Sequence, residues 1–288
     1  MRGTSIFSLP SLKKRLVLNG RTRLMISAVA AGLLLLGIVL GATFLSGQGL
    51  RVSLESRDLP PSSDHLFGTD WLGRDMFART IQGLALSVGI GLAGAACSAM
   101  IAMAMGLAAA FLGRTADRII TWLIDVALSV PHLVMLILIA FVSGGGIKGI
   151  LIGIMLTHWP SLARVIRAEA LGVISADYVA VSRGFGKSRY WVMTRHLVPH
   201  LLPQLFIGFL LLFPHAVLHE AAITFLGLGF SPHQPAIGII LSESMRYLSS
   251  GMWWLAVFPG LGLLVTVRAF DRLGHALQRL IDPKHSRL

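Results

Sequence analysis

Long apolar runs alternate with short polar segments along the whole chain, a pattern typical of a protein that crosses a membrane several times. Six runs approach or exceed the length needed to cross roughly 30 Å of hydrocarbon. The predicted spans are residues 24–45, 84–112, 119–142, 147–159, 201–225 and 252–267. We expect the third span to bend at Pro131 and the fifth to be interrupted at Pro214, because proline lacks a backbone donor. The short fourth span is expected to continue into a helix outside the membrane.

The basic residues indicate how these spans are oriented. Most of the 25 Lys and Arg lie in residues 2–23, 114–118, 164–195 and 268–287, and pairs of spans separate these segments. Cytoplasmic loops are enriched in Lys and Arg, so both termini and the loop 161–203 are predicted to be cytoplasmic. The net charge of +12 then reflects topology and contact with membrane lipid, and we expect no nucleic acid partner.

Composition supports an all-α integral membrane protein. The chain is 55% hydrophobic and 13% charged, with a mean hydropathy of +0.75, whereas ordinary soluble domains carry about 25% charged residues. It has no GxxxxGK[ST] loop for nucleotide phosphates and no clustered catalytic set, which argues against an enzyme. Its single cysteine, Cys97, lies in an apolar run and offers no disulfide. A secondary transporter is a rival class, but we see no inverted repeat.

The cytoplasmic loop 161–203 is long and basic, with two acids, Glu169 and Asp177, facing six bases. A short helix is predicted from Asp177 to about Phe185, ending at Gly186, since glycine is common just after a helix. A second, amphipathic stretch follows from Arg189 to Pro199. The pattern predicts a helix–Gly–helix presented to a partner, although an ordinary connector at a membrane surface has the same pattern.

This loop resembles the EAA loop of bacterial ABC-importer permeases, the coupling helix that docks on the ATPase subunit. In the alignment, Gly186 and Pro199 occupy the conserved Gly and Pro positions. The Glu-Ala-Ala positions hold Ala180, Val181 and Ser182, preceded by Tyr178, and the glutamate is therefore missing. His196 and Val198 replace the family's Ile and Leu.

Three further stretches resemble the peptide/nickel subfamily of these permeases. The run from Phe67 to Arg79 is similar to its FGTDxxGRDxxSR motif, with Ala78 in place of Ser. The bland interpretation is a turn-rich loop in which Asp70, Arg74 and Asp75 cap and pair locally. Residues 224–229 match SFLGLG, and residues 259–283 resemble the closing pattern, with Asp271 replacing Asn and His275 replacing Asp.

The resemblance implies a type I ABC-importer permease with six helices in the bacterial inner membrane. The implied divisions are a cytoplasmic tail 1–23, a first helix 24–45, an extracytoplasmic loop 46–82, a transmembrane domain 83–272 that includes the coupling loop 161–203, and a tail 273–288. The implied partners are a homologous permease subunit, two ATP-binding subunits and an extracytoplasmic solute-binding protein. No cofactor is expected in this chain, because ATP and Mg²⁺ belong to the ATPases.

The cargo is open between peptide and nickel or a metal chelate. His215 and His219 are four residues apart, so they share a helix face, and imidazole suits nickel, zinc and copper. The nickel-transporting members are similar here and at His158. We therefore expect a metal-bearing path along His215, His219, Glu220 and His158, with the first two as tentative ligands.

Two other interpretations of these residues stay open. Histidines in a span also serve as hydrogen-bonded packing groups between helices. Glu220 would then pair with His219 or with a base. The remaining histidines, among them His132, His196, His200 and His233, show no ligand spacing and receive no role.

Overall fold

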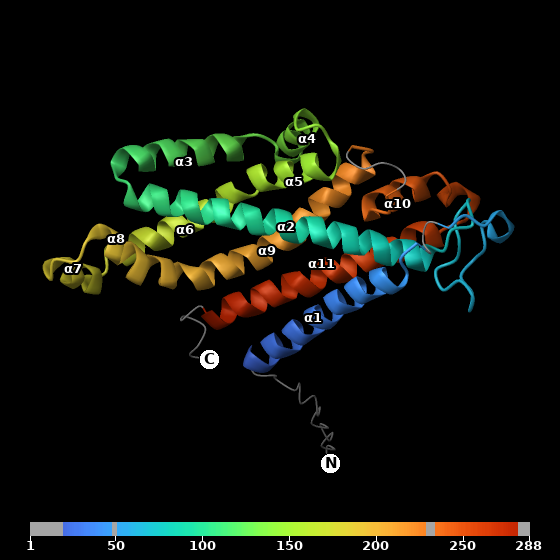
Figure 1. Cartoon of the computed structure of the whole chain (residues 1–288), viewed down its shortest axis with the longest axis horizontal. Coiled ribbons are helices and arrows are strands. Elements are labelled where there is room, and N and C mark those ends of the chain that lie inside the picture. The colour runs from blue at the N-terminus through green and yellow to red at the C-terminus, as the bar shows by residue number, and fades with distance from the viewer. Residues whose placement is uncertain (1–19, 48–50, 229–233, 282–288) are drawn as a thin grey trace, which may run out of the picture.

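The computed structural model describes residues 20–47, 51–228 and 234–281 as an elongated bundle of helices (Figure 1). Within these residues there is no strand, and one isolated bridge pairs Thr69 with Asp75. Five described helices are long and apolar enough to cross a membrane, or six if one sharply bent pair counts as a single span. The all-α prediction is confirmed. Most of the tail 1–23, His233 and the closing Asp282 and Pro283 lie outside the described residues.

The elements follow one another in this order: α1 (Gly20–Phe44), η2 (Leu54–Ser56), α2 (Met76–Phe111), α3 (Arg114–Ser129), α4 (His132–Val142), α5 (Gly146–Thr157), α6 (Trp159–Ile174), α7 (Asp177–Gly184), α8 (Arg189–Val192), η3 (Met193–Leu197), α9 (Val198–Phe225), α10 (Ile237–Met245), η4 (Leu248–Ser250) and α11 (Trp254–Ile281).

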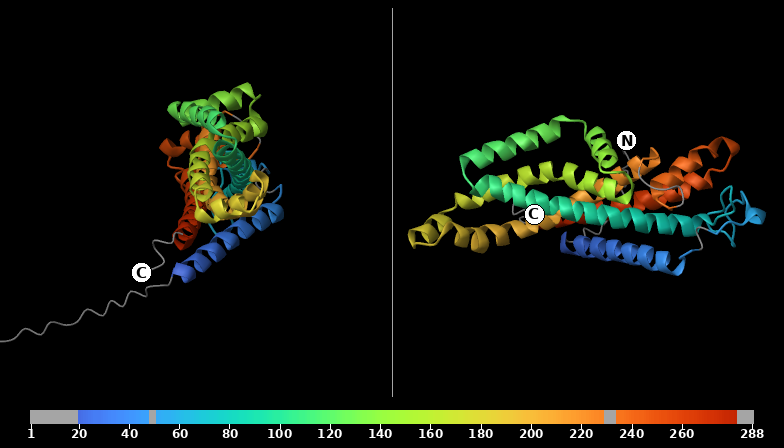
Figure 2. Two further views of the ribbon diagram at one scale, coloured as in Figure 1. Left: turned by 90° about the vertical axis from the view of Figure 1, so that its left-hand side faces the viewer. Right: turned by 45° about the horizontal axis from the view of Figure 1, so that its top comes forward.

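Helix α2 runs through the middle of the bundle and contacts α1, α3, α5, α6, α9, α10 and α11 (Figures 1 and 2). Its glycines allow the close approach. A Cβ on Gly94 would lie 2.6 Å from the side chain of Ile154, and one on Gly106 would lie 2.7 Å from that of Ile166. Small residues are common at such seams because helix association in a bilayer depends on packing rather than on hydrophobic exclusion.

The third predicted span is a bent pair of helices. α3 and α4 meet at an angle of 99°, where Val130 is extended and Pro131 precedes the first residue of α4. The residue before a proline is disfavoured in the helical region, so the chain leaves α3 at this point. The bend predicted at Pro131 is confirmed. α4 then packs against α5 as a short hairpin.

The fifth span is not interrupted at Pro214, contrary to expectation. α9 continues through both Pro203 and Pro214, and with α8 and the π-helical turn η3 it forms one helical run from Arg189 to Phe225. The amphipathic stretch after Gly186 is therefore the start of this span and not a separate helix. In an apolar medium a break would leave several backbone groups unpaired, whereas each proline removes one donor.

The prediction that the fourth span continues into a further helix is confirmed, whereas the loop after the fifth span differs from the prediction. The fourth span and the helix after it form a nearly continuous run, α5 and α6, from Gly146 to Ile174. Between α9 and α11, in the loop predicted at 227–251, lies a further helix, α10, that periodicity did not indicate. Its buried face packs against α9 and α11, so tertiary contacts and not local pattern stabilise it.

α2 begins eight residues before the predicted 84, because its polar first turns are buried and neutralised. Asp75 caps the helix by accepting a hydrogen bond from the Ala78 N–H at 2.9 Å. Arg79 is 1% exposed and donates to Asp70 at 2.7 Å and to Glu243 of α10 at 2.9 Å. A hydropathy pattern places an arginine such as Arg79 in a loop. A buried arginine is nevertheless tolerated in a helix when its charge is paired and hydrogen-bonded.

Asp70, Arg74, Arg79 and Glu243 form an ionic cluster that closes the end of the bundle near α10. Asp70 is fully buried and also accepts from Arg74 Nε at 2.7 Å and from the backbone N–H of Arg74 at 2.9 Å. The predicted local pairing in this loop is confirmed. The tie from Arg79 to Glu243, 164 residues away, could not be read from the sequence.

We predict that Arg79→Met destabilises the chain by about 3 kcal/mol, because removing one partner leaves a buried charge undercompensated. The measurement is thermal unfolding of the purified chain in detergent. The matched control is Arg164→Met, whose pair with Asp125 is exposed and whose loss should cost at most about 1 kcal/mol. Equal losses in the two variants would contradict a structural role for the cluster.

Gly94→Ala should destabilise the bundle by about 1–3 kcal/mol, since overpacking forces neighbours to shift. Gly89→Ala is the control on the same helix, because a Cβ there meets no atom within 4 Å. Alanine is the better helix former, so this control should be neutral or slightly stabilising. The measurement is the unfolding temperature of each variant in detergent. An unfolding temperature of Gly94→Ala equal to that of the wild type would show that α2 and α5 are not tightly packed at this position.

Candidate functional site

The helix predicted at 177–185 is present as α7, at the far end of the bundle from α10 (Figure 1). Tyr178, Ala180 and Val181 are exposed on it, whereas Val179 is fully buried. Phe185, directly after the helix, is 80% exposed. An exposed apolar strip on a helix that projects from the end of the molecule is a typical protein contact surface.

The turn after α7 depends on Gly186. Its φ is +77°, a region that glycine adopts without steric cost. The Gly186 N–H donates to the Arg183 carbonyl at 2.9 Å and the Lys187 N–H donates to the Ser182 carbonyl at 3.2 Å, which satisfies the last carbonyls of the helix. The prediction that α7 ends at Gly186 is confirmed, and Pro199, exposed in the first turn of α9, closes the loop.

His196, to which the sequence assigned no role, attaches α7 to the start of the following helical run. Its Nε2 lies 3.1 Å from the hydroxyl of Ser182. Its ring also packs edge-on against Tyr178 and Trp191, with centroids 5.3 and 5.2 Å away. Ser182 therefore points inward, and the position of α7 is set by side-chain contacts as well as by the chain.

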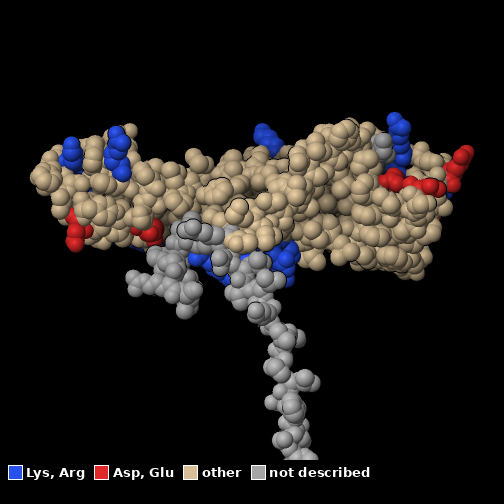
Figure 3. Space-filling view, turned by 90° about the horizontal axis from the view of Figure 1, so that it is seen from below, with Lys and Arg blue, Asp and Glu red and all other residues tan. Residues whose placement is uncertain are grey.

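Charge is distributed unevenly over the molecule. Figure 3 shows that Lys, Arg, Asp and Glu lie mainly toward the two ends of the visible face, with further Lys and Arg near its middle, and that much of the remaining surface is uncharged. The start of α1 and the end of α11 point toward the end that carries α7 (Figure 1). The predicted topology places both termini on the same side of the membrane as α7, which agrees with these directions. That this side is the cytoplasmic one stays a prediction.

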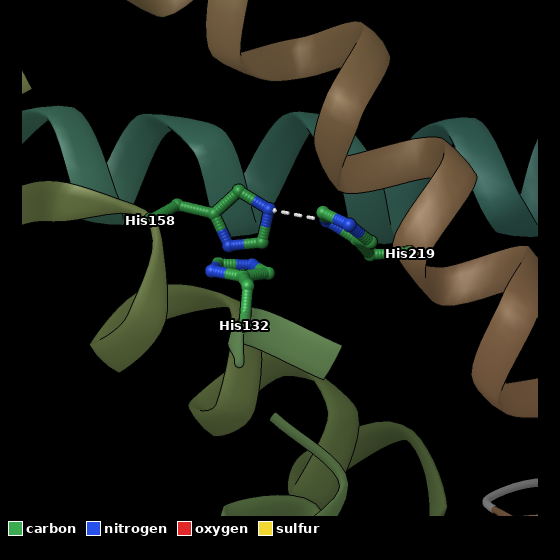
Figure 4. A group of neighbouring side chains, drawn as sticks. All are labelled: His132, His158 and His219. Carbon is green, nitrogen blue, oxygen red and sulfur yellow. Dashed lines mark hydrogen bonds between the residues drawn. The ribbon is translucent and has the colours of Figure 1, made fainter. Parts of the chain in front are cut away.

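A group of three histidines lies inside the bundle, where His132, His158 and His219 turn their rings toward one another (Figure 4). One ligand nitrogen from each lies within 4.8 Å of those of the other two. His132 is the first residue of α4, His158 joins α5 to α6, and His219 belongs to α9. Nε2 of His158 and Nδ1 of His219 are hydrogen-bonded at 2.9 Å.

The structure brings together only part of the predicted path. His158 and His219 meet, but His215 is not in the group, and it faces a groove lined also by Pro214, Leu218 and Leu264. Glu220 is fully buried, and neither carboxyl oxygen has a hydrogen-bond partner among the described residues. The expected pairing of Glu220 with His219 or a base is therefore not found there.

His132 is the member that sequence reasoning missed. It stands 26 residues before His158 and 87 before His219, so no helical spacing relates it to them. The available signal was its position directly after Pro131, at the predicted bend. In this structure the bend places His132, the first residue of α4, beside the other two.

Comparison with known proteins identifies the class to which this fold belongs. The family described as "Binding-protein-dependent transport system inner membrane component" matches residues 99–287, and the chain belongs to this family. It is 34% identical to the dipeptide transport system permease protein DppC of Bacillus subtilis (strain 168), over 84% of this chain and 76% of that protein.

Two other relatives and one solved structure are similar. The oligopeptide transport system permease protein OppC of B. subtilis (strain 168) is 31% identical over 90% of this chain and 85% of that protein. The probable D,D-dipeptide transport system permease protein DdpC of Escherichia coli (strain K12) is 32% identical over 93% of this chain and 90% of that protein. An inward-facing structure of the MetNI methionine ABC transporter aligns with a TM-score of 0.55 and 17% identity, over 70% of this chain and 97% of that one.

These similarities confirm the resemblance on which the sequence interpretation relied. The chain is a multi-pass permease component of an ATP-driven ABC importer, located in the inner membrane. The structural likeness supports the type I fold independently of sequence, because at 17% identity the shared feature is the arrangement of helices.

Proposed function

We propose that this permease carries a di- or oligopeptide delivered by an extracytoplasmic binding protein. The observation that carries the proposal is the similarity to permeases named for dipeptides and oligopeptides, at 31–34% identity over most of the chain. Nickel or a metal chelate, our first expectation for the cargo, has support from the histidines of the spans alone. Peptide import therefore replaces it as the favoured function.

In this proposal, α7 transmits the state of the ATPases to the bundle. It projects from one end, with Tyr178 and Val181 exposed on the helix and Phe185 exposed directly after it. The contacts of His196 join it to the helical run that includes α9. A docked ATPase that displaces α7 would therefore move α9 with it. The two orientations of the pore would be the two states whose populations nucleotide binding shifts.

The remaining parts of the transporter lie in other chains. The sequence has no phosphate-binding loop, so we assign ATP and Mg²⁺ to two ATP-binding subunits. A homologous permease would form the other half of the pore. This chain would supply the coupling helix and half of the transport path, and the catalytic residues for ATP hydrolysis would belong to the ATP-binding subunits.

The cargo is tested by uptake in a host strain that lacks this chain. We expect loss of radiolabelled dipeptide and oligopeptide uptake and its restoration by the wild-type gene, with ⁶³Ni²⁺ uptake the same in all strains. The peptide assignment is wrong if nickel uptake depends on the chain and peptide uptake does not.

Coupling is tested at Gly186. Gly186→Val should abolish peptide uptake at normal protein level, because a β-branched residue is strained at positive φ, with a cost on the order of 1 kcal/mol or more. The space around Gly186 is open, so the effect would come from the backbone and not from a clash.

Gly186→Asn is the matched control, since asparagine tolerates the left-handed region and should keep most of the uptake. Assembly with the ATPase is measured by co-purification. Normal transport by Gly186→Val, or equal loss in both variants, would contradict the proposed dependence on the turn after α7.

A further inference from the structure

The three histidines that meet inside the bundle have the composition and spacing of a metal site. We propose that His132, His158 and His219 together bind one divalent late transition-metal ion, of the class that includes Ni²⁺, Zn²⁺ and Cu²⁺, for which imidazole is a suitable ligand. Their nitrogens already lie within 4.8 Å of one another. Nitrogens that share one ion lie about 3–3.5 Å apart, given metal–imidazole bonds of about 2.0–2.1 Å, so ring rotations close the remaining distance.

His158 is held in the tautomer that a metal ligand needs. Its Nδ1 lies 3.0 Å from the backbone carbonyl oxygen of Ile154 and 3.1 Å from the hydroxyl of Thr157. A carbonyl can only accept, so Nδ1 carries the proton and Nε2 presents a lone pair to the other two rings. Ligating histidines almost always donate their second ring N–H in this way, which fixes the orientation of the ring.

His132 supplies a second, independent indication. Its Nε2 is buried and has no hydrogen-bond partner among the described residues. If the cluster served only for packing, each buried ring nitrogen would be expected to have a donor or an acceptor. The His132 ring itself lies beside the other two, with its centroid 4.5 Å from that of His158 and 4.6 Å from that of His219. An ion between the three rings would satisfy that buried nitrogen.

Binding requires no loss of a proton. In the metal-free cluster the Nδ1–H of His219 donates to Nε2 of His158, a hydrogen bond of 2.9 Å. For Nδ1 of His219 to ligate the ion in place of this bond, its proton moves to Nε2 of the same ring, so each imidazole stays neutral and offers one unprotonated nitrogen. Three protein ligands leave a fourth position open. The ion would join α4, the α5–α6 junction and α9, and so brace the bend between α3 and α4.

The test measures metal binding by the full chain, purified in detergent with an affinity tag that contains no histidine. Equilibrium dialysis against Ni²⁺, and separately against Zn²⁺, is expected to give one ion per chain. His132→Gln and His219→Gln should each weaken binding at least tenfold. The control variants, His200→Gln and His275→Gln, remove histidines near Glu169 and Asp271 at the surface and should bind as the wild type does.

A second readout covers the case in which a variant fails to fold. The X-ray absorption spectrum of Zn²⁺ on the wild-type chain should show three imidazole nitrogens at about 2.0–2.1 Å. Fewer imidazoles, absence of stoichiometric binding, or binding that all four variants retain would overturn the proposal. Neither measurement involves transport, so the result stands apart from the outcome of the peptide-uptake experiment.

Discussion

Close packing against α2 is the constraint on which the rest of the structure depends. Gly94 meets the side chain of Ile154 on α5, and Gly91 on the same helix meets Val217 on α9. The carbonyl of Ile154 also orients His158, and Val217 lies two residues before His219. The glycines of α2 therefore set how far apart α5 and α9 lie, and with it the distance between two of the clustered histidines. A bilayer favours such seams because van der Waals contact drives the association of its helices.

The two ends of the bundle are held by different kinds of contact, ion pairs at the end near α10 and a few side-chain contacts and a turn at the end that carries α7. Near α10, the buried Asp70, Arg74 and Arg79 form ion pairs with one another and with the partly exposed Glu243, and this fixes the start of α2 relative to α10. At the other end, α7 is held by the contacts of His196, by the buried side chain of Val179 and by one turn at Gly186, while Tyr178 and Val181 remain exposed. A rigid end and a projecting end would suit the proposed displacement of α7 by a docked ATPase.

The histidine cluster lies where two helical discontinuities, the bend before α4 and the junction of α5 with α6, meet the unbroken helix α9. Regular helices in a bilayer satisfy their own backbone groups, so polar chemistry within a span usually marks a place where this regularity fails or a function resides. His158 illustrates the link, because it sits between two helices and directs its ring inward. The proposed metal binding here and the proposed import of peptides are compatible, since they involve different ligands.

The sequence by itself determined the class, the helical content and several local details. The hydrophobic runs, the bend at Pro131 and the end of α7 at Gly186 depend on neighbouring residues, and each of these features is found in the structure. Only the tertiary structure decided the early start of α2, the unbroken course of α9 through Pro214, the existence of α10, and the meeting of His132 with His158 and His219. Each of these depends on contacts between residues far apart in the chain, where burial and partner groups override what the local pattern favours.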